Sequence, residues 1–234
     1  MNMPAESTAP CLDSIRLAVG QIMPATVEWQ IEAIAAEDLE ARAADAGIVA
    51  YADDLRPSRR REFLAGRLAA RAALQQLGCA QPTVGMADLV PVWPAQYCGS
   101  ISHSGGLAVA VAGGSPPWLS LGIDIELRMG ERRHRVVRGF MAAAEARAVE
   151  HSSHPWAWTR AWAAKEAAYK CCSAMGAEVA PEVLSPIWRE PDWGVLEILI
   201  DGRPVVIELV CRIAGDLIWV LASNRPIQAQ TGTR

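Results

Sequence analysis

The chain has 234 residues, of which 51% are hydrophobic and 21% are charged, and its formal net charge is −4. This length allows one large or two small domains with a buried core. There is no overall basic field, so we expect no nucleic-acid partner. No run of about 18 apolar residues is present and the first residues lack the pattern of a signal peptide, so we expect a cytoplasmic protein that does not span a membrane.

The start of the chain is weakly patterned until a long helix begins. We expect a loose tail over residues 1–12, a strand at 14–20 and a helical stretch from about Ala33 to Ala46. The first strongly patterned element is a helix over 56–78, which starts with Pro57-Ser58 and ends at a glycine. Its leucines form one apolar stripe that is surrounded by arginines.

A glycine-rich hairpin and a proline-rich breaker follow this helix. Residues 81–99 are rich in proline and irregular, whereas SISHSGGLAVAVAGG (100–114) predicts two strands joined by a tight turn. GGSPPW (113–118) interrupts any regular structure and is the best internal boundary. We therefore expect an N-terminal lobe over 1–118 and a C-terminal lobe over 119–234.

The second half of the chain repeats the mixture of a long helix with strands. LSLGIDIEL predicts a strand at 119–127, and an arginine-rich segment follows at 128–138. Two helices are predicted at 142–150 and 156–174, and three further strands at 194–200, 204–213 and 216–223. Both halves thus predict an α+β fold of two similar lobes in one chain. The halves share no obvious sequence repeat.

GIDIE (122–126) places two carboxylates on one face of a strand. Side chains two residues apart point to the same face, so Asp124 and Glu126 project together while Ile123 and Ile125 face the core. Neighbouring carboxylates repel unless a cation or a proton lies between them, and hard oxygen ligands suit Mg²⁺. A polar outer face of an edge strand gives the same pattern, so both interpretations stay open.

WAAKEAAYK (162–170) contains both lysines of the chain, Lys165 and Lys170, whereas the other 20 basic residues are arginines. On a helix, Glu166 and Lys170 have the favourable spacing for an ion pair, worth about 0.3–0.5 kcal/mol at a surface. Arginine would serve equally well there, so a retained lysine indicates a compact charge for a phosphate oxygen. Chance clustering of two lysines is the alternative.

Further anion-binding candidates lie in the first half of the chain. His103 is next to the glycine turn, where backbone N–H groups could face an anion, or where the ring could cap the turn. Arg59 and Arg67 are about two helical turns apart and could share ligand phosphates. A solvated charged helix face is the alternative.

Four segments, taken in their order along the chain, resemble the 4′-phosphopantetheinyl transferases. Within this family they resemble the enterobactin synthetase component D-like group. The segments are RRREFLAGRLAARAAL (59–74), VWPAQYCGSISHSGGLAVAVA (92–112), LGIDIE (121–126) and WAAKEAAYK (162–170). The resemblance implies transfer of the phosphopantetheine arm of coenzyme A to a serine of an apo acyl or peptidyl carrier protein, with release of 3′,5′-ADP. It also implies two similar α/β lobes with coenzyme A between them, and a monomer.

Carried over to this sequence, the resemblance implies that Asp124, Glu126 and Glu166 bind Mg²⁺. Glu166 would also take the proton from the serine, and Lys170 would stabilise charge on the diphosphate. The implied contacts to coenzyme A and its bound metal are Arg59, Arg67, Ser102, His103, Asp124, Lys165 and Lys170. Lys165 could instead be simply the more exposed of the two lysines.

The chain departs from the family near Leu89, where a basic residue usually precedes PxWP but Asp88 and Leu89 stand here. One contact to coenzyme A could therefore be lost, which leaves a carrier-binding homologue without catalysis as an alternative. A generic Mg²⁺-dependent phosphohydrolase would use the same carboxylates. The arginine-rich segment 128–138 could receive an acidic carrier protein or form a mobile solvated loop. Siderophore, peptide and polyketide pathways all stay open.

Overall fold

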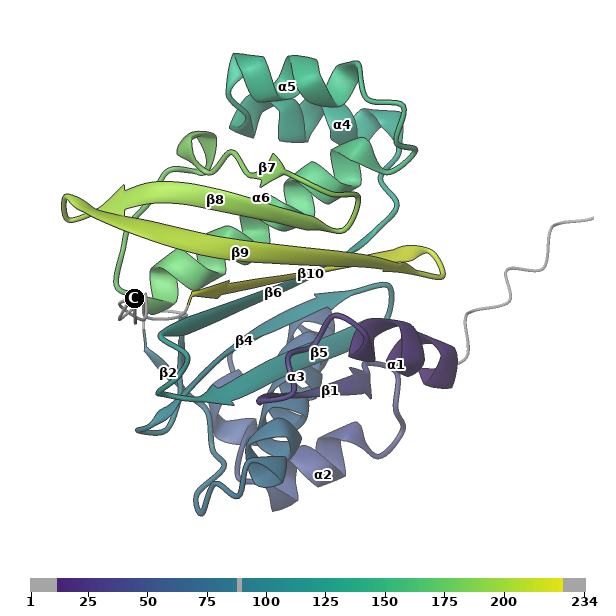
Figure 1. The fold of residues 1–234 in the computed structure, drawn as a ribbon. Coiled ribbons are helices and arrows are strands. Elements are labelled where there is room, and N and C mark those ends of the chain that lie inside the picture. The colour runs from purple at the N-terminus through teal and green to yellow at the C-terminus, as the bar shows by residue number, and fades with distance from the viewer. Residues whose placement is uncertain (1–11, 88–89, 225–234) are drawn as a thin grey trace, which may run out of the picture.

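Two main antiparallel sheets lie edge to edge across the molecule, each with a long helix on one face (Figure 1). This computed structural model describes residues 12–87 and 90–224. Its α-helices are α1 (Leu12–Gly20), α2 (Leu39–Asp45), α3 (Pro57–Gln76), α4 (Glu131–Val137), α5 (Ala143–Glu150) and α6 (Ala157–Ala174). Its strands are β1 (Val27–Ala33), β2 (Gly85–Ala87), β3 (Val90–Val92), β4 (Tyr97–Ser104), β5 (Leu107–Gly114), β6 (Ser120–Leu127), β7 (Ile187–Trp188), β8 (Trp193–Ile200), β9 (Arg203–Ala214) and β10 (Leu217–Asn224). Over the described residues, no helix has the length and apolar character needed to cross a membrane.

The two main sheets have the same topology. The strand order is β1-β5-β4 in the first sheet and β6-β10-β9-β8-β7 in the second. In each sheet the first strand pairs antiparallel with the last strand of a hairpin, β4–β5 or β9–β10. The long helix that follows the first strand, α3 or α6, packs on that strand and its partner. The predicted α+β fold of two similar lobes is therefore confirmed.

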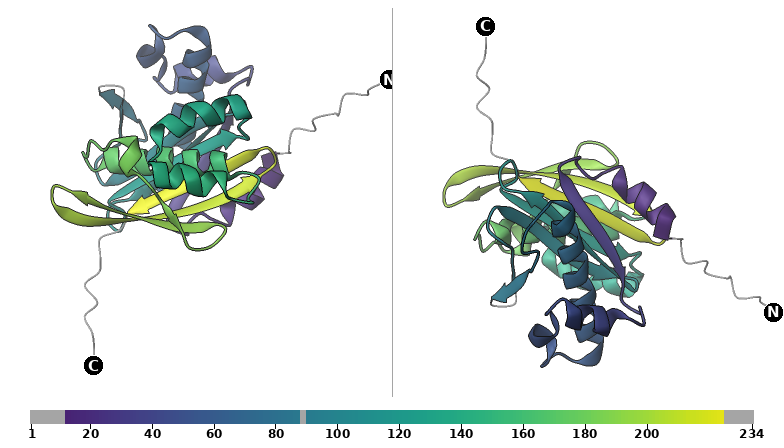
Figure 2. Two further views of the ribbon diagram at one scale, coloured as in Figure 1. Left: turned by 90° about the horizontal axis from the view of Figure 1, so that it is seen from above. Right: turned by 90° about the horizontal axis from the view of Figure 1, so that it is seen from below.

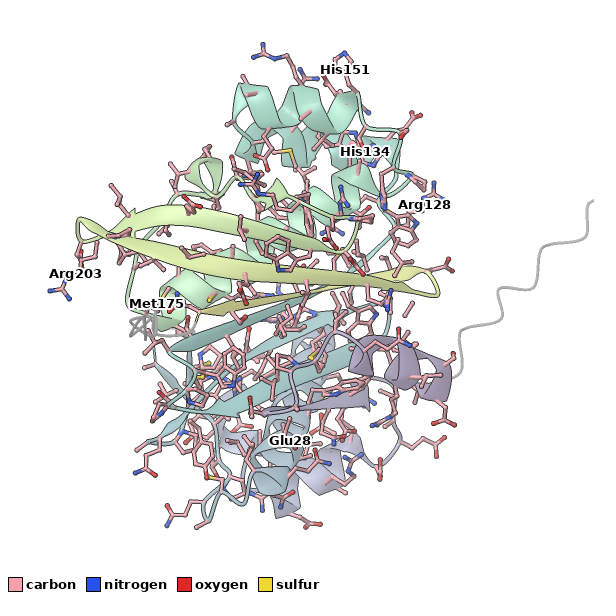
Figure 3. The ribbon with its side chains drawn as sticks, in the orientation of Figure 1. Glu28, Arg128, His134, His151, Met175 and Arg203 are labelled. Atoms are coloured by element: carbon pink, nitrogen blue, oxygen red, sulfur yellow. The ribbon has the colours of Figure 1, made fainter. Side chains whose placement is uncertain are left out.

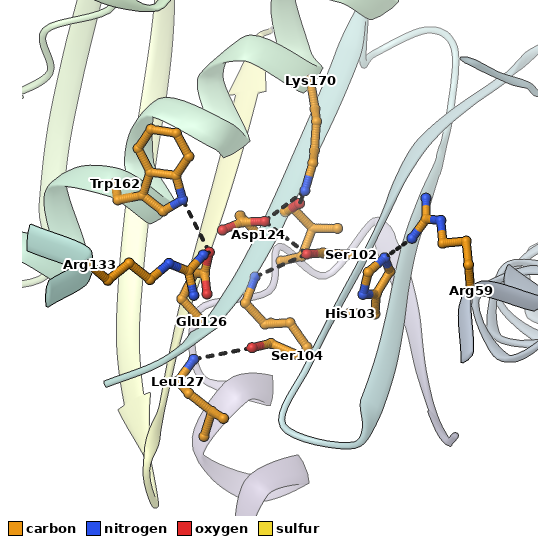
Figure 4. A network of polar contacts seen from close by, with 12 residues as sticks. Arg59, Ser102, His103, Ser104, Asp124, Glu126, Leu127, Arg133, Trp162 and Lys170 are labelled. Carbon is orange, nitrogen blue, oxygen red and sulfur yellow. Dashed lines mark hydrogen bonds and ion pairs between the residues drawn. The ribbon is translucent and has the colours of Figure 1, made fainter. Parts of the chain in front are cut away.

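Serine side chains join the two sheets where the edge strands β4 and β6 lie side by side. The backbone N–H groups of Ile125 and Leu127 donate to Ser102 Oγ at 3.3 Å and to Ser104 Oγ at 3.2 Å. Main-chain carbonyls accept such bonds in a regular sheet. These hydroxyls hold the SISHSGG strand directly beside the GIDIE strand, as Figure 4 shows.

A buried apolar cluster connects both sheets on the faces that point away from α3 and α6. It includes Val109 of β5, Ile123 of β6 and Trp219 of β10, together with Ile15 and Val19 of α1. Helix α1 lies against β9, and Figure 2 shows it in purple beside the yellow strands. Because both lobes contribute to this cluster, its loss would destabilise both of them.

Several local expectations differ from the structure. Residues 14–20, expected as a strand, belong to α1, because Ile15 and Val19 bury one face at helical spacing. The expected helical stretch from Ala33 to Ala46 shrinks to α2, and the unpredicted strand β1 precedes it.

Two further segments are more ordered than expected. Residues 81–99 contain the short strands β2 and β3. The arginine-rich segment 128–138 contains helix α4, which is anchored by buried Val137, so the expectation of a solvated loop is wrong there. Residues 1–11, with most of the expected tail, lie outside the described residues, as does the Asp88-Leu89 departure.

Candidate active site

Asp124 and Glu126 lie on the face of β6 that α6 covers, and both are buried. Ile123 and Ile125 point into the apolar cluster shared by the sheets. The predicted alternation is therefore confirmed, and the alternative of a solvated edge strand is wrong. Gly122 lets the helix come close, because a Cβ there would lie 1.9 Å from the carbonyl oxygen of Ala167.

Asp124 joins both lobes through one carboxylate oxygen. Its Oδ1 accepts hydrogen bonds from Ser102 Oγ at 2.8 Å and from Lys170 Nζ at 2.7 Å (Figure 4). Lys170 Nζ also donates to the carbonyl oxygen of Ile123 at 3.0 Å. Among the described residues, Asp124 Oδ2 is buried without a hydrogen-bond partner. Such an atom is costly when left unpaired, so a ligand that binds it gains free energy.

Glu166 stands apart from this ion pair. The predicted pair between Glu166 and Lys170 does not form, because Lys170 reaches across to Asp124 on the neighbouring strand. Burial is the main cause that raises the pKa of Glu166; the charge of Lys170 opposes it, the charge of Asp124 adds to it and Arg133 opposes it. A half-buried carboxylate with a raised pKa and no ion-pair partner among the described residues is suited to accept a proton.

Glu126 is held by two donors from different helices. Its Oε1 accepts hydrogen bonds from Arg133 of α4 at 2.7 Å and from Trp162 Nε1 of α6 at 3.1 Å. Burial, with the nearby charge of Asp124, raises the pKa of Glu126 to about 7, although both donors act against this. Sequence reasoning did not place Arg133 in the site, and its only signal was membership of the arginine-rich segment.

His103 and Arg59 meet beside this network. His103 Nε2 is in hydrogen-bond contact with the guanidinium of Arg59, which extends from α3 toward β4 (Figure 4). Glu62 lies 3.2 Å from Arg59 and 3.7 Å from His103 Nε2. Burial is the main cause that lowers the pKa of His103, which favours a neutral ring. The structure therefore brings together the predicted arginine helix and the SHSGG strand.

Arg67 is buried farther along α3. Its Nη2 donates to the carbonyl oxygen of Gly85 at 3.2 Å, its guanidinium lies over the ring of Phe63, and its Nε has no partner among the described residues. Burial first, and then the positive charge of Arg59, lower the pKa of Arg67 to about 10. Within the described part of the chain no carboxylate pairs with Arg67. A buried cation of this kind favours an anionic ligand.

Lys165 points away from the other site residues. Its Nζ pairs with Glu145 at 2.7 Å and donates to the carbonyl oxygens of Pro181 at 3.0 Å and Leu184 at 2.5 Å. Its side chain is 2% exposed, against 25% for Lys170. The prediction of a phosphate contact does not fit this placement, and the alternative that Lys165 is the more exposed lysine is wrong.

The three expected metal ligands do not form a closed cage. In the parts of the chain that the structure describes, no group of three His, Cys, Asp or Glu is close enough to enclose a metal ion. Mg²⁺, however, commonly binds one or two carboxylates and completes its shell with water and substrate phosphates. The oxygen-only ligands and the unpartnered Asp124 Oδ2 fit this way of binding.

Together these residues surround the junction of the two lobes with both signs of charge. Carboxylates come from β6 and α6, and cationic or hydrogen-bonding groups come from α3, β4 and α6. Such an arrangement suits a polyanionic ligand that binds through phosphates and a divalent cation.

Comparison with known proteins assigns the chain to one family. Residues 49–113 match the family model of the 4′-phosphopantetheinyl transferase N-terminal domain, and residues 120–204 match that of the 4′-phosphopantetheinyl transferase superfamily. The two regions together make up more than half of the chain. The chain therefore belongs to the 4′-phosphopantetheinyl transferase superfamily.

Curated relatives narrow the resemblance to the enterobactin synthase component D-like group. The chain is 36% identical over 119 residues to enterobactin synthase component D of Salmonella typhimurium, which covers 49% of each protein. The Escherichia coli K12 protein of that name is 49% identical over 70 residues, covering 29% of this chain and 31% of the relative. 4′-Phosphopantetheinyl transferase Npt of Nocardia iowensis is 34% identical over 106 residues, covering 45% and 46%. The chain thus spans about half the length of the curated relatives it matches first.

Proposed function

We propose that the protein transfers the 4′-phosphopantetheine arm of coenzyme A to a serine of an acyl or peptidyl carrier protein and releases 3′,5′-ADP. The observation that carries this proposal is the convergence of three family motifs on Asp124. Ser102 of SHSGG and Lys170 of the WAAKEAAYK helix both bind its Oδ1, and Asp124 belongs to GIDIE. We assign the two lobes to 1–118 and 119–234, and with both lobes in one chain we propose a monomer.

Coenzyme A phosphates would bind to the basic residues of the first lobe and to Lys170. Arg59 is accessible and adjoins His103, whereas Arg67 is buried without an anionic partner among the described residues. Phosphate groups would supply the negative charge that these guanidinium groups favour. Lys170 lies at the junction beside Asp124, where its compact ammonium would face the diphosphate.

Asp124, Glu126 and Glu166 would hold Mg²⁺. When bound, this ion supplies positive charge that neutralises the diphosphate and withdraws electrons from its phosphorus atoms. Support comes from the unpartnered, buried Asp124 Oδ2 and from the raised pKa values of both glutamates, which result mainly from burial. A nearby cation stabilises the ionised form of such carboxylates.

The protein's own groups account for the proton and for the charge of the leaving group. The serine oxygen forms a bond to the phosphorus next to the pantetheine arm, and the bond from that phosphorus to the bridging oxygen breaks. The electron pair leaves with 3′,5′-ADP, and the Lys170 ammonium stabilises the charge that develops there. The serine proton passes to the carboxylate of Glu166, and Ser102 keeps Asp124 in place through its hydrogen bond.

A mass-shift assay tests this function directly. The protein, Mg²⁺ and coenzyme A are mixed with a panel of apo carrier proteins from siderophore, peptide and polyketide systems. We expect at least one carrier to gain the mass of one phosphopantetheine group, and Glu166→Gln to abolish the gain without loss of the fold. Glu178→Gln, which removes an exposed carboxylate from the loop after α6, is the matched control and should react normally. Inactivity of the wild-type protein toward every carrier would contradict the proposal.

Two further measurements, carrier binding and phosphate release, separate the other candidate functions. A carrier-binding homologue without catalysis would bind apo carriers but leave their mass unchanged. A phosphohydrolase would release phosphate from simple esters without any carrier. A phosphohydrolase would use the same carboxylates but would give no role to the paired Arg59 and His103 of the first lobe, so transfer is the function that the site favours.

A further inference from the structure

Arg133 enters the carboxylate site from outside the four segments that resemble the family. It belongs to α4 and donates from Nη2 to Glu126 Oε1 at 2.7 Å (Figure 4). Its side chain is 51% exposed, whereas that of Glu126 is 10% exposed. The contact therefore joins a half-exposed cation to a nearly buried anion.

Helix α4 is packed so that Arg133 must lie near Glu126. Val137 is buried beneath the helix, and the ring of His134 stacks on Trp158 of α6 with centroids 5.4 Å apart. Just before α4, the backbone N–H of Met129 donates to Thr159 Oγ1 at 3.0 Å. Figure 3 labels His134 on this helix in the upper lobe. The backbone of Arg133 is thus held in place while its guanidinium stays half exposed.

Each buried carboxylate of β6 has its own cation in this state. Lys170 pairs with Asp124, and Arg133 is the only ion-pair partner of Glu126 in the described parts of the chain. The mutual repulsion of the two carboxylates is offset by these cations. A divalent cation that binds both carboxylates must therefore compete with Lys170 and Arg133, which already neutralise them.

The two resident cations differ in how easily they can leave. Lys170 Nζ is also bound to the carbonyl oxygen of Ile123, and its side chain is mostly buried. Among the described residues Arg133 makes one hydrogen bond, and it borders an open hollow of about 350 Å³ together with Gly130, Arg132 and Val136. Room is thus available for the guanidinium to turn away from Glu126 without movement of α4.

We propose that Arg133 is a built-in counter-ion of Glu126 that a divalent cation displaces, so that Arg133 sets the metal affinity of the site. This inference rests on the metal site of the proposed function. Arg133 lowers the affinity for the free ion, because the metal must break an existing ion pair before it binds Glu126. It also balances the charge of Glu126 while no metal is bound.

Metal titration of the full chain tests the inference without any turnover. Mg²⁺ binding to protein treated with EDTA and then dialysed is measured by calorimetry, without coenzyme A or carrier. We expect Arg133→Gln to tighten Mg²⁺ binding about tenfold, which corresponds to about 1.4 kcal/mol. The matched control is Arg132→Gln, which removes the same charge from the neighbouring exposed residue. Its effect should stay within about twofold at physiological salt, because solvent screens exposed charges.

A double-mutant cycle shows whether the effect acts through Glu126. In the Glu126→Gln background, Arg133→Gln should no longer change the affinity, because the ion pair is already absent. Arg133→Lys keeps a cation at this place and should stay close to the wild type.

Equal affinities of Arg133→Gln and Arg132→Gln would overturn the inference and leave the proposed function standing. Mg²⁺ binding to Arg133→Gln but not to the wild type would support the inference strongly. If neither protein binds Mg²⁺ alone, the inference falls, whereas the mass-shift assay still decides the proposed function.

Discussion

Lys165 offers a sharp test of how the WAAKEAAYK helix is built, through the substitution Lys165→Met. Methionine keeps most of the volume but removes the ammonium, which pairs with Glu145 at 2.7 Å and donates to the carbonyl oxygens of Pro181 and Leu184. The Glu145 side chain is only 11% exposed, so its charge would be left nearly buried without a cation, and among the described residues only Ser185 Oγ would still donate to it, at 3.2 Å. Breaking a buried ion pair in this way costs about 3–5 kcal/mol.

This cost is large relative to the stability of a domain, which is about 5–15 kcal/mol. In a protein of this size, 1 kcal/mol shifts the melting temperature by about 2–4 °C, so Lys165→Met should lower it by about 10 °C. Thermal unfolding followed by circular dichroism measures the shift. The double variant Lys165→Met, Glu145→Leu replaces both charges with apolar groups and should recover much of the loss.

The result that refutes this reasoning is equally clear. If Lys165 contacts a phosphate of coenzyme A, Lys165→Met would leave the melting temperature within about 1 °C of the wild type, as for most surface substitutions. It would then raise the KM for coenzyme A while the fold stays intact. A structural lysine predicts the opposite pattern of large destabilisation in the absence of any ligand.

Three further predictions concern the junction between the lobes. Gly122→Ala should strongly reduce the melting temperature and the transfer activity, because the new Cβ would meet the Ala167 carbonyl. The control Gly139→Ala, whose Cβ would have no atom within 4 Å, should behave like the wild type in the same melting and mass-shift assays. Burial and a neighbouring charge raise the pKa of Glu126 to about 7 from the 4.5 of an unfolded glutamate, so the folded state holds this proton more tightly. In EDTA the free energy of unfolding should therefore fall by at most about 3 kcal/mol as the pH rises from about 4.5 to 7, which urea titrations measure. The variant Glu126→Gln should lack this pH dependence. Ser102→Ala removes the hydroxyl that binds both the Asp124 carboxylate and a backbone N–H of the other lobe. It should therefore lower kcat for transfer by tenfold or more in a carrier assay. An unchanged kcat would contradict the positioning role of Ser102.

Much of the fold was predictable because its signals are local. The helix over 56–78 and the helix over 156–174 carry clear periodicity and end signals, and the structure has them as α3 and α6. The strand predicted at residues 14–20 was wrong, because a short apolar pattern that includes Ile15 and Val19 fits either a strand or a helix. Strand β1 was missed, although apolar and polar side chains alternate strictly along VEWQIEA, which is the period of a half-buried strand.

The candidate site was only partly predictable. The alternation in GIDIE correctly placed Asp124 and Glu126 on one face, because strand geometry alone decides this. The pairing of Lys170 with Glu166, which helical spacing allowed as the alternative to a phosphate contact, does not form, because the packing of α6 on β6 brings the ammonium to Asp124. Arg133 gave no signal of its own within a run of arginines.

The sequence by itself determined the two long helices, which residues of GIDIE share a face and which family the chain resembles. These properties depend on residues near one another in the chain, or on motifs that keep their order. Only the tertiary structure decided that Lys165 is buried in an ion pair with Glu145, that Lys170 pairs with Asp124 and that Arg133 pairs with Glu126. The physical reason is that an ion pair between distant segments depends on how closely helices and sheets pack, and the absence of a side chain at Gly122 sets that distance for α6.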